Sequence, residues 1–331
     1  MAKSSNNDFK ENFSERYRIT DGSQFKLAEC STAPAFKIDN GEAKEALEEI
    51  VEEISELQNI LYADNKWSLL LVFQAMDAAG KDSTIKNILT GVNPQGVDVF
   101  SFKSPSTLEL DHTYLWRTDC RAPERGKIGV FNRSYYEETL VVRVHPEILA
   151  KQHLNKSLIT ENIWQERFED IRNREKHMSR NGTVVLKFFL NISREEQKQR
   201  FLERIDRPQK NWKFEKADIH ERQFWDDYMM AYEETIQNTA TEYAPWYVIP
   251  GDSKPFARLM VADAVHQALK NLNLEYPQLH PDALDYLAQC REILMNEEEY
   301  LSKKSQDKAE EQAGKDKEGK DKGNKDKKSK D

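Results

Sequence analysis

The chain has 331 residues and a formal net charge of −9, with 38% hydrophobic and 32% charged residues. The length favours one large α/β domain with appendages, and the acidic balance argues against broad nucleic-acid binding. No apolar run approaches the roughly 20 residues that span a bilayer, and residues 1–10 are polar throughout, without a secretory signal. The sequence therefore predicts a cytoplasmic protein with no membrane segment.

The first strongly patterned segment is residues 42–62, which predicts an amphipathic helix. Its apolar residues recur at alternating spacings of three and four: Leu47, Ile50, Ile54, Leu57 and Leu61. The stripe is shorter than a coiled coil usually needs. Packing against its own domain is therefore the favoured interpretation, and a dimer seam is the alternative.

The most informative stretch is Q-A-M-D-A-A-G-K-D at residues 74–82. It follows a short apolar run at 68–73, typical of a central parallel strand, and precedes helical spacing at 81–90. A loop between such elements aims backbone N–H groups and a helix N-terminus at one point, where negative charge is favoured. The sequence therefore predicts a phosphate-binding loop, in which Lys81 supplies a cation and Asp77 a carboxylate for Mg²⁺.

This loop departs from the pattern G-x-x-x-x-G-K-[ST] at two positions. Ala75 stands at the first glycine and Asp82 at the hydroxyl position, with Ser83 and Thr84 one and two residues late. An alanine at the first position requires a turn without positive φ there. The alternative interpretation of the segment is an alanine-rich turn with a solvated lysine.

Four further strands are predicted at residues 97–102, 127–132, 183–190 and 247–250. Strands separated by helical segments imply right-handed crossovers, so the sequence predicts a five-stranded parallel sheet with helices on both faces. Ligands of such sheets bind beyond the C-terminal ends of the strands. The residues expected at those ends are Asp77, Lys81, Lys103, Asn132, Arg133 and Arg194.

A basic insertion separates the last two strands, and we expect it to form a lid at about 194–230. Ser193 and Glu196 have the spacing of a capping box that starts a helix, and Pro208 ends it. Residues 194–213 contain seven basic and four acidic residues, as a mobile cover over phosphates would. The basic residues of interest are Arg200, Arg204 and Arg207 on one helix face, followed by Lys210 and Lys213. An ordinary amphipathic helix with a solvated face is the alternative interpretation.

Residues 301–331 form a tail that repeats lysine, aspartate and glycine. From Lys303 to Asp331 it holds 11 lysines against 8 acidic residues, with no apolar residue after Ala313. Such a segment has nothing to bury in a core and is expected to be disordered, as a solubility tail or as a tether for a polyanion. The predicted organisation is an N-terminal extension at 1–35, one domain at 36–300 and this tail.

These segments together resemble the family-2 polyphosphate kinases, which transfer phosphate between inorganic polyphosphate and nucleotides. The resemblance covers about Phe36 to about Leu269. It rests on L-L-V-F-Q-A-M-D-A-A-G-K-D-S-T-I at 70–85, N-P-Q-G-V at 93–97, F-K-S-P-S at 102–106, L-W-R at 115–117, G-K-I-G-V-F-N-R-S-Y-Y-E at 126–137, S-R-E-E-Q-K-Q-R-F at 193–201, P-Q-K-N-W-K at 208–213, W-D-D-Y at 225–228 and A-P-W-Y-V-I-P at 244–250. It implies a P-loop kinase-like three-layer fold, with a central five-stranded parallel sheet and a helical lid.

The resemblance also implies an activity and its partners. It implies reversible transfer of the terminal phosphoryl group of polyphosphate to AMP or ADP, giving ADP and ATP. F-N-R-S-Y-Y-E at 131–137 is similar to the branch that accepts both nucleotides. Mg²⁺, with Mn²⁺ as a substitute, is the implied cofactor. A homo-oligomer, either a dimer or a tetramer, is the implied assembly, and neither a specific nucleic acid nor a membrane is an implied partner.

Residue roles follow from the same resemblance. Lys81 would bind the transferred phosphate, Arg133 would stabilise the transferring phosphoryl group, and Asp77 would bind Mg²⁺. Many members have aspartate at the position of Asn132 and asparagine at that of Glu137, so we infer that Glu137 supplies the metal-site carboxylate that Asn132 lacks. These five are the candidate catalytic residues. The candidate substrate-binding residues are Ala78, Ala79, Gly80, Asp82, Ser83, Lys103, Arg117, Arg121, Arg200, Arg204, Arg207, Lys210 and Lys213.

Two other functions are compatible with the same residues. An ATP-dependent nucleotide or metabolite kinase would use the same loop, although the lid carries more cations than one nucleotide should need. A sensor that binds polyphosphate or nucleotides without turnover would explain the departures at Ala75 and Asn132. The histidines lack metal-ligand spacing, and the terminal phosphate of a nucleotide is already ionised at neutral pH, so the predicted chemistry requires no histidine base.

Overall fold

The computed structural model of the chain describes residues 12–306 and 308. They fall into two compact units that divide between Tyr276 and Pro277. In the second unit, α12 (Pro281–Met295) is followed by residues 297–306, which are also helical. The tail predicted to be disordered begins at residue 301, but residues 301–306 are helical. Residue 307 and the tail from residue 309 onward lie outside the described residues, and the predicted domain limits stay a prediction.

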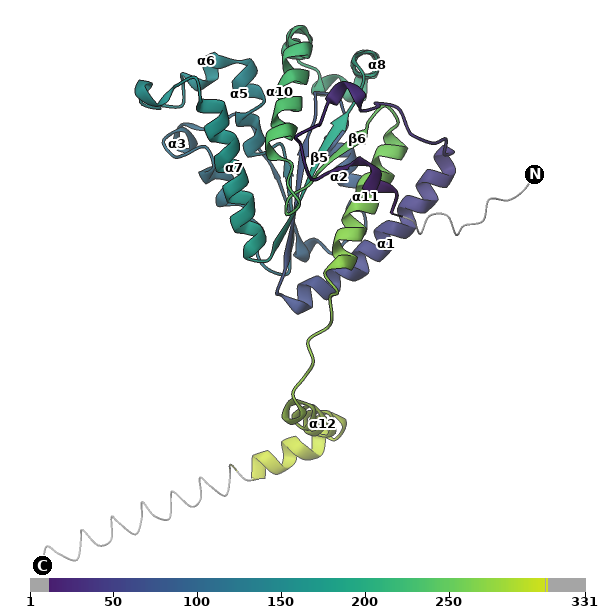
Figure 1. Cartoon of the computed structure of the whole chain (residues 1–331). Helices are drawn as coiled ribbons and strands as arrows, with labels where there is room; N and C mark the ends of the chain where they lie inside the picture. Colours follow the sequence, from purple (N-terminus) through teal and green to yellow (C-terminus); the bar gives the residue numbers. More distant parts are fainter. Residues whose placement is uncertain (1–11, 307, 309–331) are drawn as a thin grey trace, which may run out of the picture. The chain divides into compact units, whose positions relative to one another are not determined.

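A mixed, mostly parallel sheet forms the centre of the first unit (Figure 1). Among residues 12–276 it has six strands, in the order β1 (Arg18–Ile19), β6 (Trp246–Pro250), β5 (Thr183–Asn191), β2 (Ser68–Gln74), β4 (Ile128–Asn132) and β3 (Val97–Ser101). The five predicted strands pair in parallel. The sixth, β1, was not predicted and joins β6 antiparallel at the edge. The predicted α/β fold is confirmed, with this short edge strand as an addition.

Helices cover both faces of the sheet. The helix α1 (Asn40–Asp64) packs against α11 (Lys254–Asn271), which also contacts α2 (Lys81–Ile88) and β6. On the other face, α7 (Ile163–Arg180) packs on β5 and contacts α10 (Trp225–Thr239). Figure 1 shows these two groups on opposite sides of the strands. The predicted three layers are therefore present.

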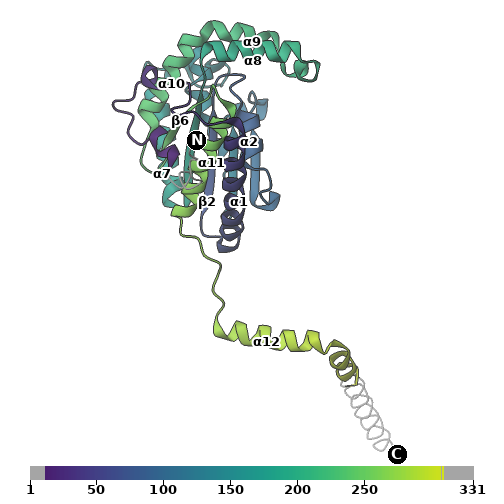
Figure 2. The ribbon, with the colours of Figure 1, turned by 90° about the vertical axis from the view of Figure 1, so that its right-hand side faces the viewer.

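The remaining elements are short. They are the helices α3 (Thr107–Leu110), α4 (Trp116–Asp119), α5 (Val141–Val144), α6 (Pro146–Leu149), α8 (Arg194–Asp206) and α9 (Lys216–Glu221), and the 3₁₀ turns η2 (Phe13–Tyr17), η3 (Leu27–Glu29), η4 (Pro94–Gly96), η5 (Tyr135–Glu138), η6 (Lys156–Leu158), η7 (Pro208–Lys213) and η8 (Arg222–Phe224). Figure 2 shows α8 and α9 across one end of the sheet, where we expected the lid. No helix within residues 12–306 is both long enough and apolar enough to cross a bilayer.

The apolar patterns explain which faces are buried. Every residue of β2 is buried, as expected for a central strand. The stripe of α1 buries Leu47, Ile54 and Leu61, and its packing on α11 in the same unit agrees with the favoured interpretation of that helix. Asp39 caps the start of α1 with a complete capping box.

The capping box predicted for α8 is only half formed. The helix begins at Arg194 as predicted, because the Ser193 hydroxyl accepts a hydrogen bond from the Glu196 N–H at 3.1 Å. The Ser193 N–H donates to the Asp252 carboxylate at 2.8 Å, and the Glu196 carboxylate accepts a charge-assisted hydrogen bond from Arg200 at 2.6 Å. Both groups of the missing half of the box therefore have other partners.

Candidate active site

The loop between β2 and α2 has the backbone geometry of a tight turn. Ala78 and Gly80 both have positive φ, at 62° and 105°, and Gly80 is the N-cap of α2. Ala75 is not among the residues with positive φ, so an alanine fits where the common pattern has glycine. The loop thus keeps the conformation that the sequence pattern requires in spite of its first departure.

Lys81 folds back over this loop. Its ammonium donates to the carbonyl oxygen of Ala75 at 2.7 Å and to that of Met76 at 3.5 Å. Burial lowers the pKa of Lys81, whereas the nearby Asp77 carboxylate favours the charged form. The cation is therefore held beside the cavity by backbone carbonyls.

Arg133 faces the loop from the end of β4. Its N–H donates to the carbonyl oxygen of Phe73 at 3.1 Å, its φ is 63°, and its guanidinium pairs with an Asp77 oxygen at 3.1 Å. Burial opposes its charge, but the carboxylates of Glu137 and Asp77 raise the pKa of Arg133 overall. The backbone of this arginine is fixed by β2 while its side chain reaches the phosphate loop.

Two further candidate residues have protein partners nearby. The Asn132 amide donates to Asp82 at 2.7 Å and to the Ser101 hydroxyl at 3.4 Å. The Glu137 carboxylate accepts from the Gln74 amide at 3.0 Å, and burial raises the pKa of Glu137. Asn132 therefore braces the start of α2, and Glu137 is tied to the last residue of β2.

A cavity of about 710 Å³ joins the loop, the strand ends and the lid. It brings together most of the predicted residues: Asp77, Ala78, Ala79, Gly80, Lys81, Asp82, Ser83, Lys103, Asn132, Arg133, Arg200, Arg204, Lys210 and Lys213. Of the predicted residues, all of which the structure describes, four lie outside the lining: Glu137, Arg117, Arg121 and Arg207. The C-terminal ends of the strands thus border one cavity lined by many cationic side chains, where the sheet topology predicts a ligand site.

Arg117 and Arg121 lie behind one wall of this cavity. Arg117 donates to the Lys103 carbonyl oxygen at 2.6 Å and stacks over the Phe102 ring at 5.1 Å. Arg121 stacks over Phe100 at the same distance. In this structure the two arginines support the segment that carries Lys103 into the cavity.

Arg200 is the most buried of the predicted lid cations, with 4% of its surface exposed. Its guanidinium donates to the carbonyl oxygens of Ala78 and Ala79 in the phosphate loop, at 3.2 and 2.6 Å. It also donates to the carbonyl oxygen of Gly251, after β6, at 2.6 Å. Arg200 therefore joins α8, the loop and the end of β6.

The other lid cations make weaker contacts. Arg204 lies 3.8 Å from Asp218, and Lys210 lies 3.6 Å from Glu203. Lys213 lies 5.0 Å from the centre of the Trp212 ring. Such partly exposed contacts contribute little to stability, so they hold these side chains only loosely.

Lys254 and Arg258, which sequence reasoning missed, line the cavity one helical turn apart at the start of α11. Among the described residues, neither has an ion pair. Burial lowers the pKa of both, and the positive charge of Arg200 adds to this effect. The rule that ligands bind after strand ends, applied to β6 as well, would have found Lys254. The other lining residues that were missed are Ser101, Phe102, Ser104, Glu203 and Glu215.

A divalent metal in the cavity would meet the Asp77 carboxylate at the loop, whereas the neighbouring Asp82 carboxylate accepts a hydrogen bond from Asn132 at 2.7 Å. Among the described residues, no group of three or more histidine, cysteine or acidic side chains has metal-site geometry. Mg²⁺ typically binds proteins through one or two carboxylates and takes its other ligands from phosphates and water. Asp77, which is 36% exposed beside the loop, fits that arrangement.

The fold and the cavity define a phosphate-binding α/β protein of the P-loop kinase-like class, with cations on the loop, on the lid and after the last strand. The family model for polyphosphate kinase 2 matches residues 37–277. The chain belongs to the polyphosphate kinase 2 family.

Individual relatives agree with this assignment. A protein of Rhodopseudomonas palustris named ADP-polyphosphate phosphotransferase is 48% identical over 85% of this chain and 98% of its own length. One of Meiothermus ruber, named AMP/ADP-polyphosphate phosphotransferase, is 41% identical over 80% of this chain and 96% of its own. The crystal structure of polyphosphate kinase 2 from Arthrobacter aurescens matches with a TM-score of 0.76 and 35% identity, over 84% of this chain and 96% of that one.

Proposed function

We propose that this protein transfers the terminal phosphoryl group of inorganic polyphosphate to AMP and to ADP, giving ADP and ATP. The observation that carries the proposal is that the loop, Arg133 and the lid cations meet in one cavity, in a chain of the polyphosphate kinase 2 family. Two strongly anionic substrates repel each other, and this cavity neutralises both.

The transfer needs positioning more than acid–base chemistry. An ionised phosphate oxygen of the nucleotide attacks the terminal phosphorus of polyphosphate, the bridging P–O bond breaks, and the shortened chain leaves as an anion. Lys81 binds the transferred group, while Arg133 takes up the charge that develops on its oxygens. Asp77 holds Mg²⁺, with Mn²⁺ as a substitute, and the metal supplies further charge neutralisation when bound. Glu137 accepts a hydrogen bond from Gln74 and supports this site through that contact.

The polyphosphate chain needs cations beyond the reacting group. Lys254 and Arg258 line the cavity without ion pairs among the described residues. They follow β6, whereas Lys103 follows β3, on the other side of β2 in the sheet. We assign Lys254, Arg258 and the lid residues Lys210 and Lys213 to the chain, and Lys103 to the acceptor phosphates. The proposal also includes a cytoplasmic location and a homo-oligomer, either a dimer or a tetramer. Measuring the molecular mass in solution tests the oligomeric state.

One experiment tests the activity and the acceptor range together. Purified protein is incubated with long-chain polyphosphate and Mg²⁺, with AMP or ADP supplied separately, and the products are resolved over time. We expect both acceptors to be phosphorylated, with ADP as an intermediate from AMP. Turnover of ADP alone would restrict the acceptor to ADP, as in the name of the Rhodopseudomonas palustris relative.

The two alternative functions give different outcomes. Nucleotide or metabolite phosphorylation from ATP, without turnover of polyphosphate, would identify an ATP-dependent kinase. Binding of polyphosphate without phosphotransfer under any metal condition would identify a sensor. In either case the proposed donor would be wrong.

A further inference from the structure

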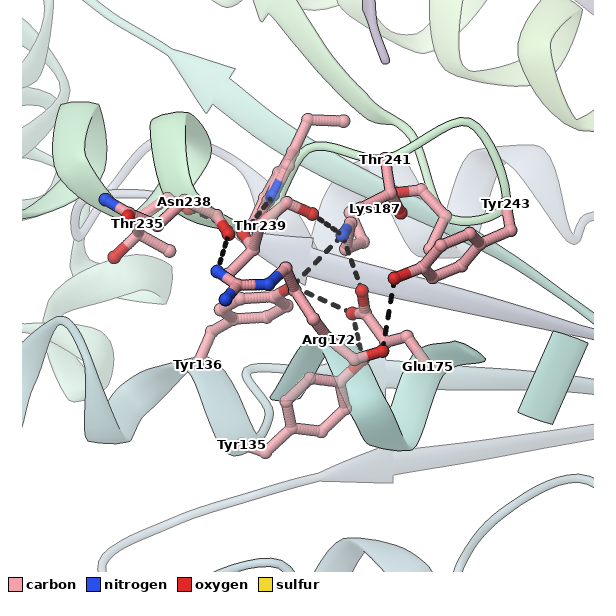
Figure 3. A network of polar contacts seen from close by, with 12 residues as sticks. Tyr135, Tyr136, Arg172, Glu175, Lys187, Thr235, Asn238, Thr239, Thr241 and Tyr243 are labelled. Carbon is pink, nitrogen blue, oxygen red and sulfur yellow. Dashed lines mark hydrogen bonds and ion pairs between the residues drawn. The ribbon is translucent and has the colours of Figure 1, made fainter. Parts of the chain in front are cut away.

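A fully buried polar network lies beneath the proposed site. The side chains of Lys187 on β5 and Glu175 on α7 are both 0% exposed, and their charged atoms are 2.7 Å apart. The remaining hydrogens of the Lys187 ammonium are donated to the Thr239 carbonyl oxygen at 2.7 Å and to the Tyr136 hydroxyl at 3.1 Å. Figure 3 shows the lysine between these groups. All three donors of the lysine are therefore used.

The other oxygen of Glu175 binds the turn that follows Arg133. The hydroxyls of Tyr135 and Tyr136 both donate to this oxygen, each at 2.8 Å (Figure 3). Burial raises the pKa of both tyrosines well above the usual range, so both remain protonated donors at neutral pH. The network thus holds two consecutive side chains of η5 through one carboxylate oxygen.

These two tyrosines lie between Arg133 and Glu137 in the sequence. On the side of β2 the same turn is tied by the Arg133 N–H to the Phe73 carbonyl oxygen and by the Gln74 amide to Glu137. The buried network connects the same turn to α7 through Glu175, to β5 through Lys187 and to α10 through Thr239. Arg133 has a left-handed backbone conformation, with φ at 63°, which persists only when its surroundings define it.

Stability alone is a weak reason for such a network. Burying an ion pair costs hydration free energy, which the attraction between the two charges only partly offsets. Proteins with apolar replacements are therefore often as stable. A fully satisfied polar network does specify one geometry, because every alternative leaves a buried group unpaired. We infer that Lys187 and Glu175, acting through Tyr135 and Tyr136, position the Arg133 guanidinium for phosphoryl transfer. This inference rests on the proposed function, and all four are positioning residues.

The test removes the two hydroxyls and keeps the rings, in the variant Tyr135→Phe/Tyr136→Phe. We expect kcat to fall about tenfold to a hundredfold, since small misplacements of a reacting group have effects of that size. The KM values for polyphosphate and nucleotide should stay within about twofold, because the loop and lid cations are not part of the network. The control is Ile171→Val, at a fully buried apolar position of α7, the helix that carries Glu175. It should lower Tm and leave kcat unchanged.

A double-mutant cycle separates positioning from a general loss of structure. In the Arg133→Ala background the same tyrosine changes should lower kcat less than about twofold, because no guanidinium is left to misplace. An equal loss in both backgrounds, or an unchanged kcat in the otherwise wild-type protein, would overturn the inference. If the double variant does not fold, Tyr135→Phe alone is carried through the same cycle. A wild-type protein without polyphosphate turnover would overturn the proposed function as well, whereas an active wild type with an additive cycle would overturn this inference only.

Discussion

The phosphate loop and the lid both present positive charge to the same cavity, but they hold it in different ways. The Lys81 ammonium is held by the carbonyl oxygen of Ala75 in the loop, and the Arg133 N–H by the carbonyl oxygen of Phe73 in the buried strand β2. Lys210 and Arg204 in the lid have only loose ion pairs, at 3.6 and 3.8 Å. The loop and the end of β4 therefore offer fixed charges, and the lid, apart from the buried Arg200, offers adaptable ones.

This difference matches two different needs of the proposed reaction. The transferring phosphoryl group must be aligned with its acceptor, and only preorganised charges stabilise the transition state without reorganisation. A polymeric donor must shift by one unit after each transfer, which adaptable contacts permit. Changes at the fixed charges should therefore lower kcat, and changes at the adaptable ones should raise KM for polyphosphate.

Arg133→Ala should have the largest effect. An arginine that neutralises a transferring phosphoryl group contributes about 10³-fold or more to kcat, and we expect a loss of that order in initial rates of ATP formation from ADP. Arg180→Ala is the matched control, since Arg180 is an exposed arginine at the far end of α7. A raised KM with an unchanged kcat in Arg133→Ala would place this arginine among the binding residues instead.

Metal dependence should distinguish Asp77 from Glu137. We expect Asp77→Asn to raise the Mg²⁺ concentration for half-maximal rate about 10-fold to 100-fold, because the Asp77 carboxylate lines the cavity at the loop. Glu137→Gln should have a smaller effect on Mg²⁺ dependence, since Glu137 lies outside the cavity lining and binds Gln74. Asp98→Asn, in a surface pair with Lys127, is the control. Equal shifts for Asp77→Asn and Glu137→Gln would make both carboxylates direct ligands.

Local patterns were enough to predict the sheet and the fixed charges. The apolar run before Gln74, the Gly80-Lys81 pair and the helix after it are contiguous, so their geometry follows from short-range rules. Arg133 was predictable because parallel strands end at one edge of the sheet. The edge strand β1 was not predictable, since two residues carry no periodicity.

Contacts between distant segments were not accessible in this way. The partners of Arg200 include Gly251, 51 residues away, so sequence spacing showed a basic helix face and not a buried guanidinium. The Lys187 ammonium likewise lies in an apolar run, T-V-V-L-K-F-F-L, where its partners on α7 and α10 cannot be read from the sequence. A charged residue inside such a run is a signal for a buried pair, because an isolated charge there would be too costly.

Lys254→Ala and Arg258→Ala test two adaptable cations of the cavity that the sequence did not predict. Each should raise KM for long-chain polyphosphate by about 3-fold to 10-fold, the loss of roughly one charge-assisted contact, with kcat nearly unchanged. The effect should shrink with tripolyphosphate as donor, because a short chain does not reach both residues and the loop. Lys270→Ala, an exposed position on the same helix, is the control. An equal effect on KM for ADP would assign the two residues to the nucleotide.

We expect the smallest change in KM for polyphosphate at Arg207. The size of this change shows how far along the lid the cations that contact polyphosphate extend. Arg207 was predicted to bind phosphate, but it lies outside the cavity lining, whereas Lys210 lies within it. Lys210→Ala should therefore raise KM for polyphosphate about twofold to threefold at low salt and less at 0.15 M, where exposed charges are screened within about 8 Å. Arg207→Ala should stay within about 1.5-fold in both conditions, because a charge outside the cavity acts only through screened solvent. A larger effect at Arg207 than at Lys210 would mean that the lid moves on binding and brings Arg207 to the chain, so that the lining seen here describes only one position of the lid.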